Sequence, residues 1–181
     1  MLYTKLIVPT GFLISSVVIS APAFAVVYFS ETQAQKVLFP KADQFKKIEI
    51  ELSSEQIDKI KSLSGVRQRK KSPLIWKAEY KGKFLGHFFI DEVIGKHEYI
   101  TYAVALSPSG ETLGVEIMSY RETHGGEIRN ESWRKKLVGK KITDPFKLDV
   151  DVPNISGATL SCRNVLDGVK RLIILQQVIN G

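Results

Sequence analysis

The stretch from Tyr99 to Tyr120, YITYAVALSPSGETLGVEIMSY, decides the fold class. Apolar and polar residues alternate from Tyr99 to Leu106, a pattern that is typical of a strand with one buried face. Ser107-Pro108-Ser109-Gly110 then predicts a turn, because proline and glycine favour the backbone angles of turns. Thr112 to Tyr120 follows as the returning strand. The stretch therefore predicts an antiparallel β-hairpin.

A second hairpin is predicted upstream of the first. Leu74 to Tyr80 and Phe84 to Asp91 have strand patterns and are joined by a turn at Lys81-Gly82. Lys46 to Leu52 also alternates, which predicts a further strand. Consecutive hairpins of this kind indicate an antiparallel sheet.

Helical patterns flank the predicted strands. Glu31 to Phe39 has the apolar spacing of a short helix. Ser53 and Gln56 have the spacing of a capping box, and the helix that follows them is expected to end at Gly65. A short helix is expected around Trp133. A last helix is expected from about Ser161 to Ile179, with this apolar face: Val165, Leu166, Val169, Leu172, Ile173 and Ile179. The predicted fold class is α+β, an antiparallel sheet packed with helices.

Composition is that of a single globular domain. The chain has 181 residues, of which 44% are hydrophobic and 25% charged. It has one cysteine, Cys162, so an internal disulfide and a cysteine-rich metal site are excluded. We interpret Cys162 as a small core or cap residue.

The net charge of +7 raises the question of an acidic partner. Arg67, Arg69, Lys70 and Lys71 form a basic cluster without the interleaved aromatic residues of a nucleic-acid surface. We interpret this cluster as a solvated loop rather than as a docking patch for anionic headgroups or an acidic partner. Nucleic acid is not an expected partner.

The N-terminal segment, residues 1–28, carries one charge, Lys5, and a long apolar run. Ala21-Pro22-Ala23-Phe24-Ala25 offers a small-x-small cleavage site after Ala25, which indicates a signal peptide. The run from Leu6 to Phe29 also exceeds the roughly 20 residues that span a bilayer, so an uncleaved membrane anchor is the alternative. Both predictions place residues 29–181 in the periplasm or on the outer face of the cytoplasmic membrane.

The segment from Asn154 to Ser161, NISGATLS, combines small residues and hydroxyl groups at the start of the predicted last helix. Gly157 lets the backbone approach a ligand closely. The N–H groups and the dipole of a helix start favour a phosphate. The alternative is that Thr159 and Ser161 only cap the helix.

The segment from Tyr120 to Ile128, YRETHGGEI, directly follows a predicted strand. Gly125 and Gly126 allow a tight turn, on which acidic, hydroxyl, imidazole and backbone groups could converge around a ligand. The alternative is a polar connecting loop. Glu122 with His124 lacks the further ligands of a metal site. No nucleophile motif is present either, so we predict no catalytic residue and no metal site.

These two segments, in this order, resemble the FMN-binding domain family. The family's Ser-Gly-Ala-Thr sequence is present as residues 156–159, and its Glu-Thr-x-Gly loop as residues 122–125. Leu38-Phe39-Pro40 and Gly95-Lys96-His97 are weaker matches. The resemblance covers roughly residues 31–175. The family includes the C subunit of the sodium-translocating NADH:quinone oxidoreductase and the G subunit of the Rnf complex.

The resemblance implies FMN as the cofactor, joined through a phosphoester bond to Thr159 by an FMN transferase. The backbone N–H groups from Gly157 to Leu160 would neutralise the phosphate, and the loop from Glu122 to Gly126 would face the isoalloxazine and ribityl chain. The implied cofactor-binding residues are Glu122, Thr123, His124, Gly125, Gly126, Ser156, Gly157, Ala158, Thr159, Leu160 and Ser161.

One position departs from the family's attachment sequence. An Asp usually stands six residues before the attached Thr, where this chain has Pro153. Asp151 lies two residues earlier and would substitute only through a shifted backbone. The departure puts recognition by the FMN transferase in question.

The function that the resemblance implies is that of an extracytoplasmic flavoprotein. It would carry electrons between membrane-associated redox partners rather than act as a stand-alone enzyme. Two alternatives remain open. One is an FMN-dependent reductase of the same fold, and the other is a non-redox binding module of the cell envelope.

Overall fold

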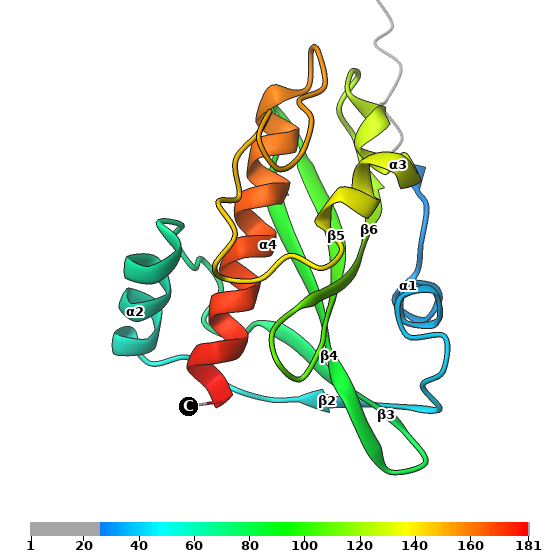
Figure 1. Cartoon of the computed structure of the whole chain (residues 1–181), viewed down its shortest axis with the longest axis vertical. Coiled ribbons are helices and arrows are strands. Elements are labelled where there is room, and N and C mark those ends of the chain that lie inside the picture. Colours follow the sequence, from blue (N-terminus) through cyan, green and yellow to red (C-terminus); the bar gives the residue numbers. More distant parts are fainter. Residues whose placement is uncertain (1–25, 181) are drawn as a thin grey trace, which may run out of the picture.

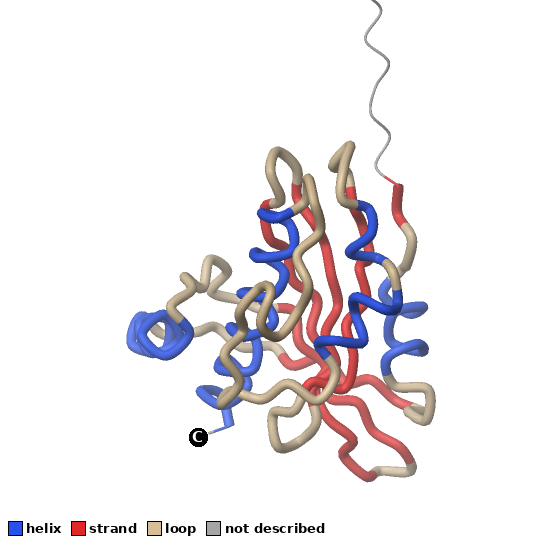
Figure 2. The backbone as a smooth tube through the Cα atoms, turned by 45° about the horizontal axis from the view of Figure 1, so that its top comes forward, coloured by secondary structure: helices blue, strands red, loops and turns tan. Residues whose placement is uncertain are grey.

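An antiparallel sheet forms the centre of the molecule, with helices on both of its faces (Figures 1 and 2). The computed structural model describes residues 26–180. The sheet has six strands in the order β1-β6-β5-β4-β3-β2. They are β1 (Val26–Val27), β2 (Gln44–Ile48), β3 (Leu74–Tyr80), β4 (Lys83–Ile94), β5 (Tyr99–Leu106) and β6 (Thr112–Tyr120). The α+β class and the antiparallel sheet are confirmed.

Four α-helices and two short 3-10 turns complete the fold. The helices are α1 (Glu31–Leu38), α2 (Ser54–Ser64), α3 (Glu131–Arg134) and α4 (Thr159–Asn180). The 3-10 turns are η1 (Gly126–Arg129) and η2 (Lys135–Leu137). Across residues 26–180, none of the helices has an apolar stretch long enough to cross a membrane. Residues 1–25 of the predicted signal peptide or anchor lie outside the described residues.

Val26 and Val27 belong to the sheet, although the sequence assigns them to the N-terminal segment. They pair with Tyr120 and Ser119 as the edge strand β1. The sheet therefore begins at the first described residue rather than after residue 28.

The two predicted hairpins are confirmed. In the β3–β4 hairpin, Lys81 and Gly82 both have positive φ, at 49° and 76°, as a tight two-residue turn requires. In the β5–β6 hairpin, Leu106 pairs with Thr112 around the predicted turn. β4 is longer than expected and continues to Ile94.

The strand predicted at Lys46 to Leu52 is wrong at both ends. β2 spans Gln44–Ile48, where Ile48 pairs with Ile75 of β3. Alternation continues to Leu52 because that side chain is still buried in the core. Its backbone has left the ladder, however, and the Leu52 N–H donates to the carbonyl of Lys71 at 2.9 Å.

Neighbouring residues of the strands face two separate cores. Ile75 and Phe89 lie in the core under α4, whereas Trp76 and Phe88 lie in the core under α1. Figure 1 shows α4 and α1 on opposite sides of the strands. α2 packs beside α4, and the predicted capping box of Ser53 and Gln56 is present at its start.

A buried polar group fixes α4 against the sheet. Arg171 of α4 pairs with Asp91 of β4, and the Tyr102 hydroxyl donates to the same carboxylate at 2.6 Å. Gly168 lies directly over Tyr102, because a Cβ at Gly168 would stand 2.0 Å from the tyrosine oxygen. The position of α4, and of the site at its first turn, therefore depends on this contact.

Candidate cofactor site

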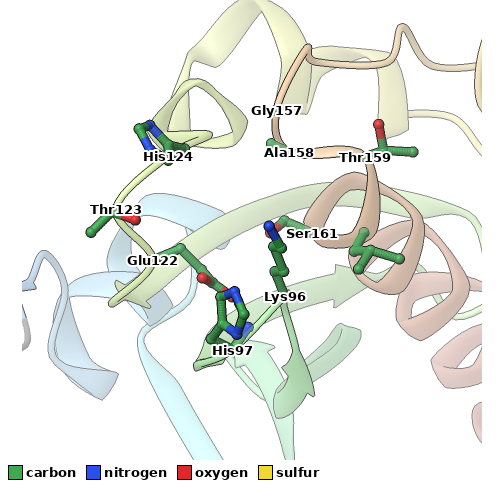
Figure 3. Close-up of a pocket in the computed structure, with 10 residues that line it drawn as sticks. Lys96, His97, Glu122, Thr123, His124, Gly157, Ala158, Thr159 and Ser161 are labelled. Atoms are coloured by element: carbon green, nitrogen blue, oxygen red, sulfur yellow. The ribbon is translucent and has the colours of Figure 1, made fainter.

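A cavity of about 300 Å³ opens where β4 and β6 end and α4 begins (Figure 3). Three segments form its wall: the turn after β4, the segment after β6 and the first turn of α4. The lining residues are Lys96, His97, Glu122, Thr123, His124, Gly157, Ala158, Thr159, Leu160 and Ser161. The two segments that resemble the FMN-binding domain family thus meet at one cavity.

Three of the predicted site residues lie off this wall. Ser156 is exposed just before the cavity, and Gly125 is buried behind it. Gly126 opens η1 and lines a neighbouring hollow together with Thr123 and His124. These residues shape the loops rather than face the cavity.

Gly125 joins the two segments by direct packing. It has a φ of +84°, and a Cβ at this position would lie 2.1 Å from the Ala158 Cβ and 2.8 Å from the Tyr120 hydroxyl oxygen. Only glycine allows this approach and this backbone angle together.

Tyr120, the last residue of β6, ties the same loop to α4. Its buried hydroxyl donates to the carbonyl of His124 and lies 3.4 Å from the Ser161 hydroxyl. Burial raises the pKa of Tyr120, although the Ser161 contact acts in the opposite direction. The phenol therefore stays protonated at neutral pH and remains a donor to the loop.

α4 begins at Thr159, two residues before the predicted start. Gly157 turns the chain into the helix with a φ of +80°, and no atom lies within 4 Å of where its Cβ would be. The Cys162 N–H donates to the Ala158 carbonyl at 2.9 Å, which closes the first helical turn. The N–H groups of residues 159–161 precede that bond, so they are left for a ligand such as a phosphate.

Cys162 is fully buried in the core under α4, as predicted. Burial raises the pKa of its thiol, which makes it a poor nucleophile. Within residues 26–180, no three His, Cys, Asp or Glu side chains gather closely enough to hold a metal ion.

The turn after β4 holds the Glu122 carboxylate through one of its two oxygens. Its Oε1 accepts hydrogen bonds from the backbone N–H groups of His97, at 2.6 Å, and Glu98, at 3.0 Å. Burial alone would raise the pKa of Glu122, but the backbone donors outweigh burial and lower it. Glu122 thus lies in the cavity wall, as the resemblance implies for its loop, and its carboxylate also binds the turn after β4.

Lys96 and His97 are wall residues that the predicted site omits. They belong to the turn between β4 and β5, and their sequence was only a weak match to the family. The strand pattern contained a usable signal. When three neighbouring antiparallel strands follow one another in sequence, the first and the third strand run in the same direction. Their C-terminal ends therefore lie at the same end of the sheet. The turn after β4 must therefore lie near the segment after β6.

Asp151 does not take the place of the family's Asp. Its carboxylate pairs with Lys140 at 2.7 Å and accepts the Lys147 N–H at 2.9 Å. It is not part of the cavity wall. Pro153 is exposed, and its carbonyl accepts the Trp133 indole N–H at 2.9 Å.

The fold and the cavity define an α+β domain with a candidate ligand site where β4 and β6 end. Residues 95–174 match the model of the FMN-binding domain family, which confirms the resemblance over the part of the chain that carries the cavity. Residues 95–174 therefore match an FMN-binding domain, and FMN is the cofactor that this match supports.

A solved structure with a similar fold is that of NqrC from Shewanella oneidensis. It has a TM-score of 0.55 and 16% sequence identity, and the match covers 81% of this chain and 88% of that chain. At this identity the likeness concerns the fold. No curated protein sequence matches the chain significantly.

The wall of the cavity fits FMN chemically. The start of α4 offers backbone N–H groups for a phosphate. Ala158 and Leu160 add apolar surface, and Lys96 adds a positive charge. These contacts suit the phosphate and the isoalloxazine ring of a flavin nucleotide.

Proposed function

We propose that this protein is a flavoprotein that holds FMN in the cavity at the start of α4 and carries electrons between membrane-associated redox partners. One observation supports this most strongly. The Ser-Gly-Ala-Thr segment and the Glu-Thr-His-Gly segment lie 30 or more residues apart in sequence, yet both line one cavity, and Gly125 packs directly on Ala158 beside it.

FMN would be attached to Thr159. Its hydroxyl oxygen would attack the FMN phosphorus of a flavin dinucleotide supplied to an FMN transferase. The phosphoanhydride bond would break, AMP would leave with the hydroxyl proton passed to solvent, and the chain would gain the mass of FMN less one water. Thr159 lines the cavity and is partly exposed, so an enzyme can reach it. The N–H groups at the helix start would hold the phosphate during and after attachment.

FMN would supply the electron-accepting chemistry, and the chain would supply binding and position. Ala158 and Leu160 would shield the cofactor from water on one side. The segment of Thr123 and His124 would bound it on the other side. No side chain of this wall is needed as a nucleophile or metal ligand toward a second substrate.

We place this activity outside the cytoplasm, in the periplasm or at the outer face of the membrane. The apolar run and the cleavage signature of residues 1–28 support that placement. A covalent bond would also keep the cofactor on the protein where free FMN is scarce.

The attachment is tested with the full chain, made in a host that has an FMN transferase. Flavin fluorescence after denaturing electrophoresis measures covalent FMN. We expect Thr159→Ala to lose it entirely, whereas Thr143→Ala, a matched change at an exposed threonine away from the cavity, should keep it. Denaturation-resistant flavin in Thr159→Ala would reject Thr159 as the acceptor.

The carrier role is tested by redox titration of the loaded protein with and without membranes from the same host. We expect reversible reduction of the flavin, with reoxidation that is fast only when membranes are present. Rapid turnover with a soluble acceptor alone would instead support a stand-alone reductase. A protein that remains colourless with FMN and transferase supplied would support a non-redox binding module.

A further inference from the structure

We propose that Lys96 binds the FMN phosphate and that Glu122 is the positioning residue that holds Lys96 in place. This inference rests on the proposed FMN site and adds a cation to it that lies outside both family segments.

The turn that carries Lys96 is tightly closed and lies against α4. The Gly95 N–H donates to the Glu98 carbonyl at 2.7 Å. A Cβ at Gly95 would lie 3.1 Å from the Ser161 hydroxyl oxygen, so the turn touches the first turn of the helix. The backbone at Lys96 is thereby fixed beside the N–H groups that would receive the phosphate.

The side chain of Lys96 extends from this turn into the cavity. Figure 3 shows it rising between the segment of Glu122 and Thr123 and the start of α4, toward Ala158. Among residues 26–180, no carboxylate forms an ion pair with Lys96. Its positive charge is therefore free to pair with an anion in the cavity.

The only carboxylate in the described wall of the cavity is already committed to the turn. Glu122 accepts two backbone N–H groups through one oxygen, Oε1. The same oxygen lies so close to Gly95 that a Cβ at this position would be 2.4 Å from Oε1. Glycine at position 95 and a hydrogen-bond acceptor at position 122 are therefore required together. Without the acceptor, the turn and Lys96 lose their fixed position.

The first test measures the affinities for FMN and riboflavin, which differ only in the phosphate. The full chain is made in a host without FMN transferase, and binding is followed by flavin fluorescence. The loss of a hydrogen bond to a charged group typically weakens binding affinity by about 10-fold or more. We expect Lys96→Met to weaken FMN binding by about that factor and to leave riboflavin binding unchanged.

Two control variants accompany Lys96→Met. Lys96→Arg keeps the charge and should retain most of the FMN affinity. Lys59→Met removes the same charge from exposed α2, away from the cavity, and should change neither affinity. Unchanged FMN affinity in Lys96→Met, or an equal loss for FMN and riboflavin, would overturn the phosphate contact.

The second test separates position from charge at Glu122. The amide oxygen of glutamine can accept the same two N–H groups, so Glu122→Gln should keep the FMN affinity. Glu122→Ala should lose it selectively, like Lys96→Met, and the double variant should be no weaker than Lys96→Met alone. If Glu122→Gln were as weak as Glu122→Ala, the carboxylate charge itself would matter and the positioning role would be wrong.

The failure of this inference is distinguishable from that of the proposed function. If the unaltered chain binds neither flavin, the FMN site itself is wrong. If it binds FMN and Lys96→Met binds FMN equally well, only the role of Lys96 is wrong.

Discussion

Gly125 and Gly157 both have positive φ, but the space around them differs. Gly125 has no room for a Cβ, because Ala158 and Tyr120 occupy that space, whereas Gly157 has open space on the side where a Cβ would be. Gly125 therefore sets the distance between the two segments of the site. Gly157 sets the direction of the chain as it enters α4.

This difference predicts unequal effects of alanine at the two glycines. Gly125→Ala combines backbone strain with overpacking and should lower the free energy of unfolding by about 2 to 4 kcal/mol. Gly157→Ala, its matched control, carries only the backbone strain of about 1 kcal/mol. Urea unfolding of both variants measures the difference, and equal losses would show that the Gly125–Ala158 contact is not tight.

Pro153 is the residue at which the proposed attachment departs from the family. It is exposed and uses only its backbone carbonyl, which an aspartate would also provide. We expect Pro153→Asp to fold normally and to raise the fraction of chains that carry covalent FMN after a limited exposure to the transferase. Flavin fluorescence per chain measures that fraction. A lower fraction in Pro153→Asp would contradict a recognition role for the family's Asp.

At the scale of elements, the site depends on where α4 lies on the sheet. Arg171, Asp91 and Tyr102 join the helix to β4 and β5 in a buried network, and Gly168 allows the close approach. The cavity lies at one end of the same helix. A change near the middle of α4 should therefore be felt in flavin binding.

Gly168→Ala tests this dependence. Helix propensity alone would favour alanine by about 1 kcal/mol. The contact with Tyr102 should reverse the sign, giving a loss of about 1 to 3 kcal/mol from overpacking and a weaker affinity for FMN. Gln177→Ala, on the exposed face of α4, should change the free energy of unfolding by less than about 0.5 kcal/mol. A stabilised Gly168→Ala variant would contradict the contact.

Most elements could be predicted because their signals are local. The hairpin turns, the capping box at Ser53 and the apolar face of α4 each depend on residues that are neighbours in the sequence. β2 was misplaced because Leu52 keeps its buried side chain after the ladder has ended. The alternation of apolar and polar residues indicates which side chains are buried, and it does not indicate which backbone groups pair.

The candidate site was only partly predictable for a related reason. The resemblance assigned site roles to the segments that begin at Glu122 and Ser156, whereas Gly95-Lys96-His97 was only a weaker match and received no role. That turn reaches the site because β4, β5 and β6 are consecutive antiparallel strands, so the signal lies in the order of the strands and not in a short motif. The acceptor role of Glu122 depends on the same order of strands.

At the scale of the whole molecule, the proposed location outside the cytoplasm connects the N-terminal segment with the loading of the site. An extracytoplasmic transferase would modify only chains that have crossed the membrane. We expect a chain that lacks residues 1–25 to stay in the cytoplasm without covalent FMN while still binding added FMN. Cell fractionation with flavin fluorescence measures both properties. Covalent FMN on the truncated chain would contradict the proposed location.

The central claim is that FMN is held at the start of α4 through Thr159. The most direct test is the intact mass of the full chain from a host with an FMN transferase, followed by mapping of the modified peptide. We predict the added mass of one FMN less one water on the peptide that contains Thr159. Flavin on any other peptide would contradict the claim, as would an unmodified chain that also fails to bind added FMN.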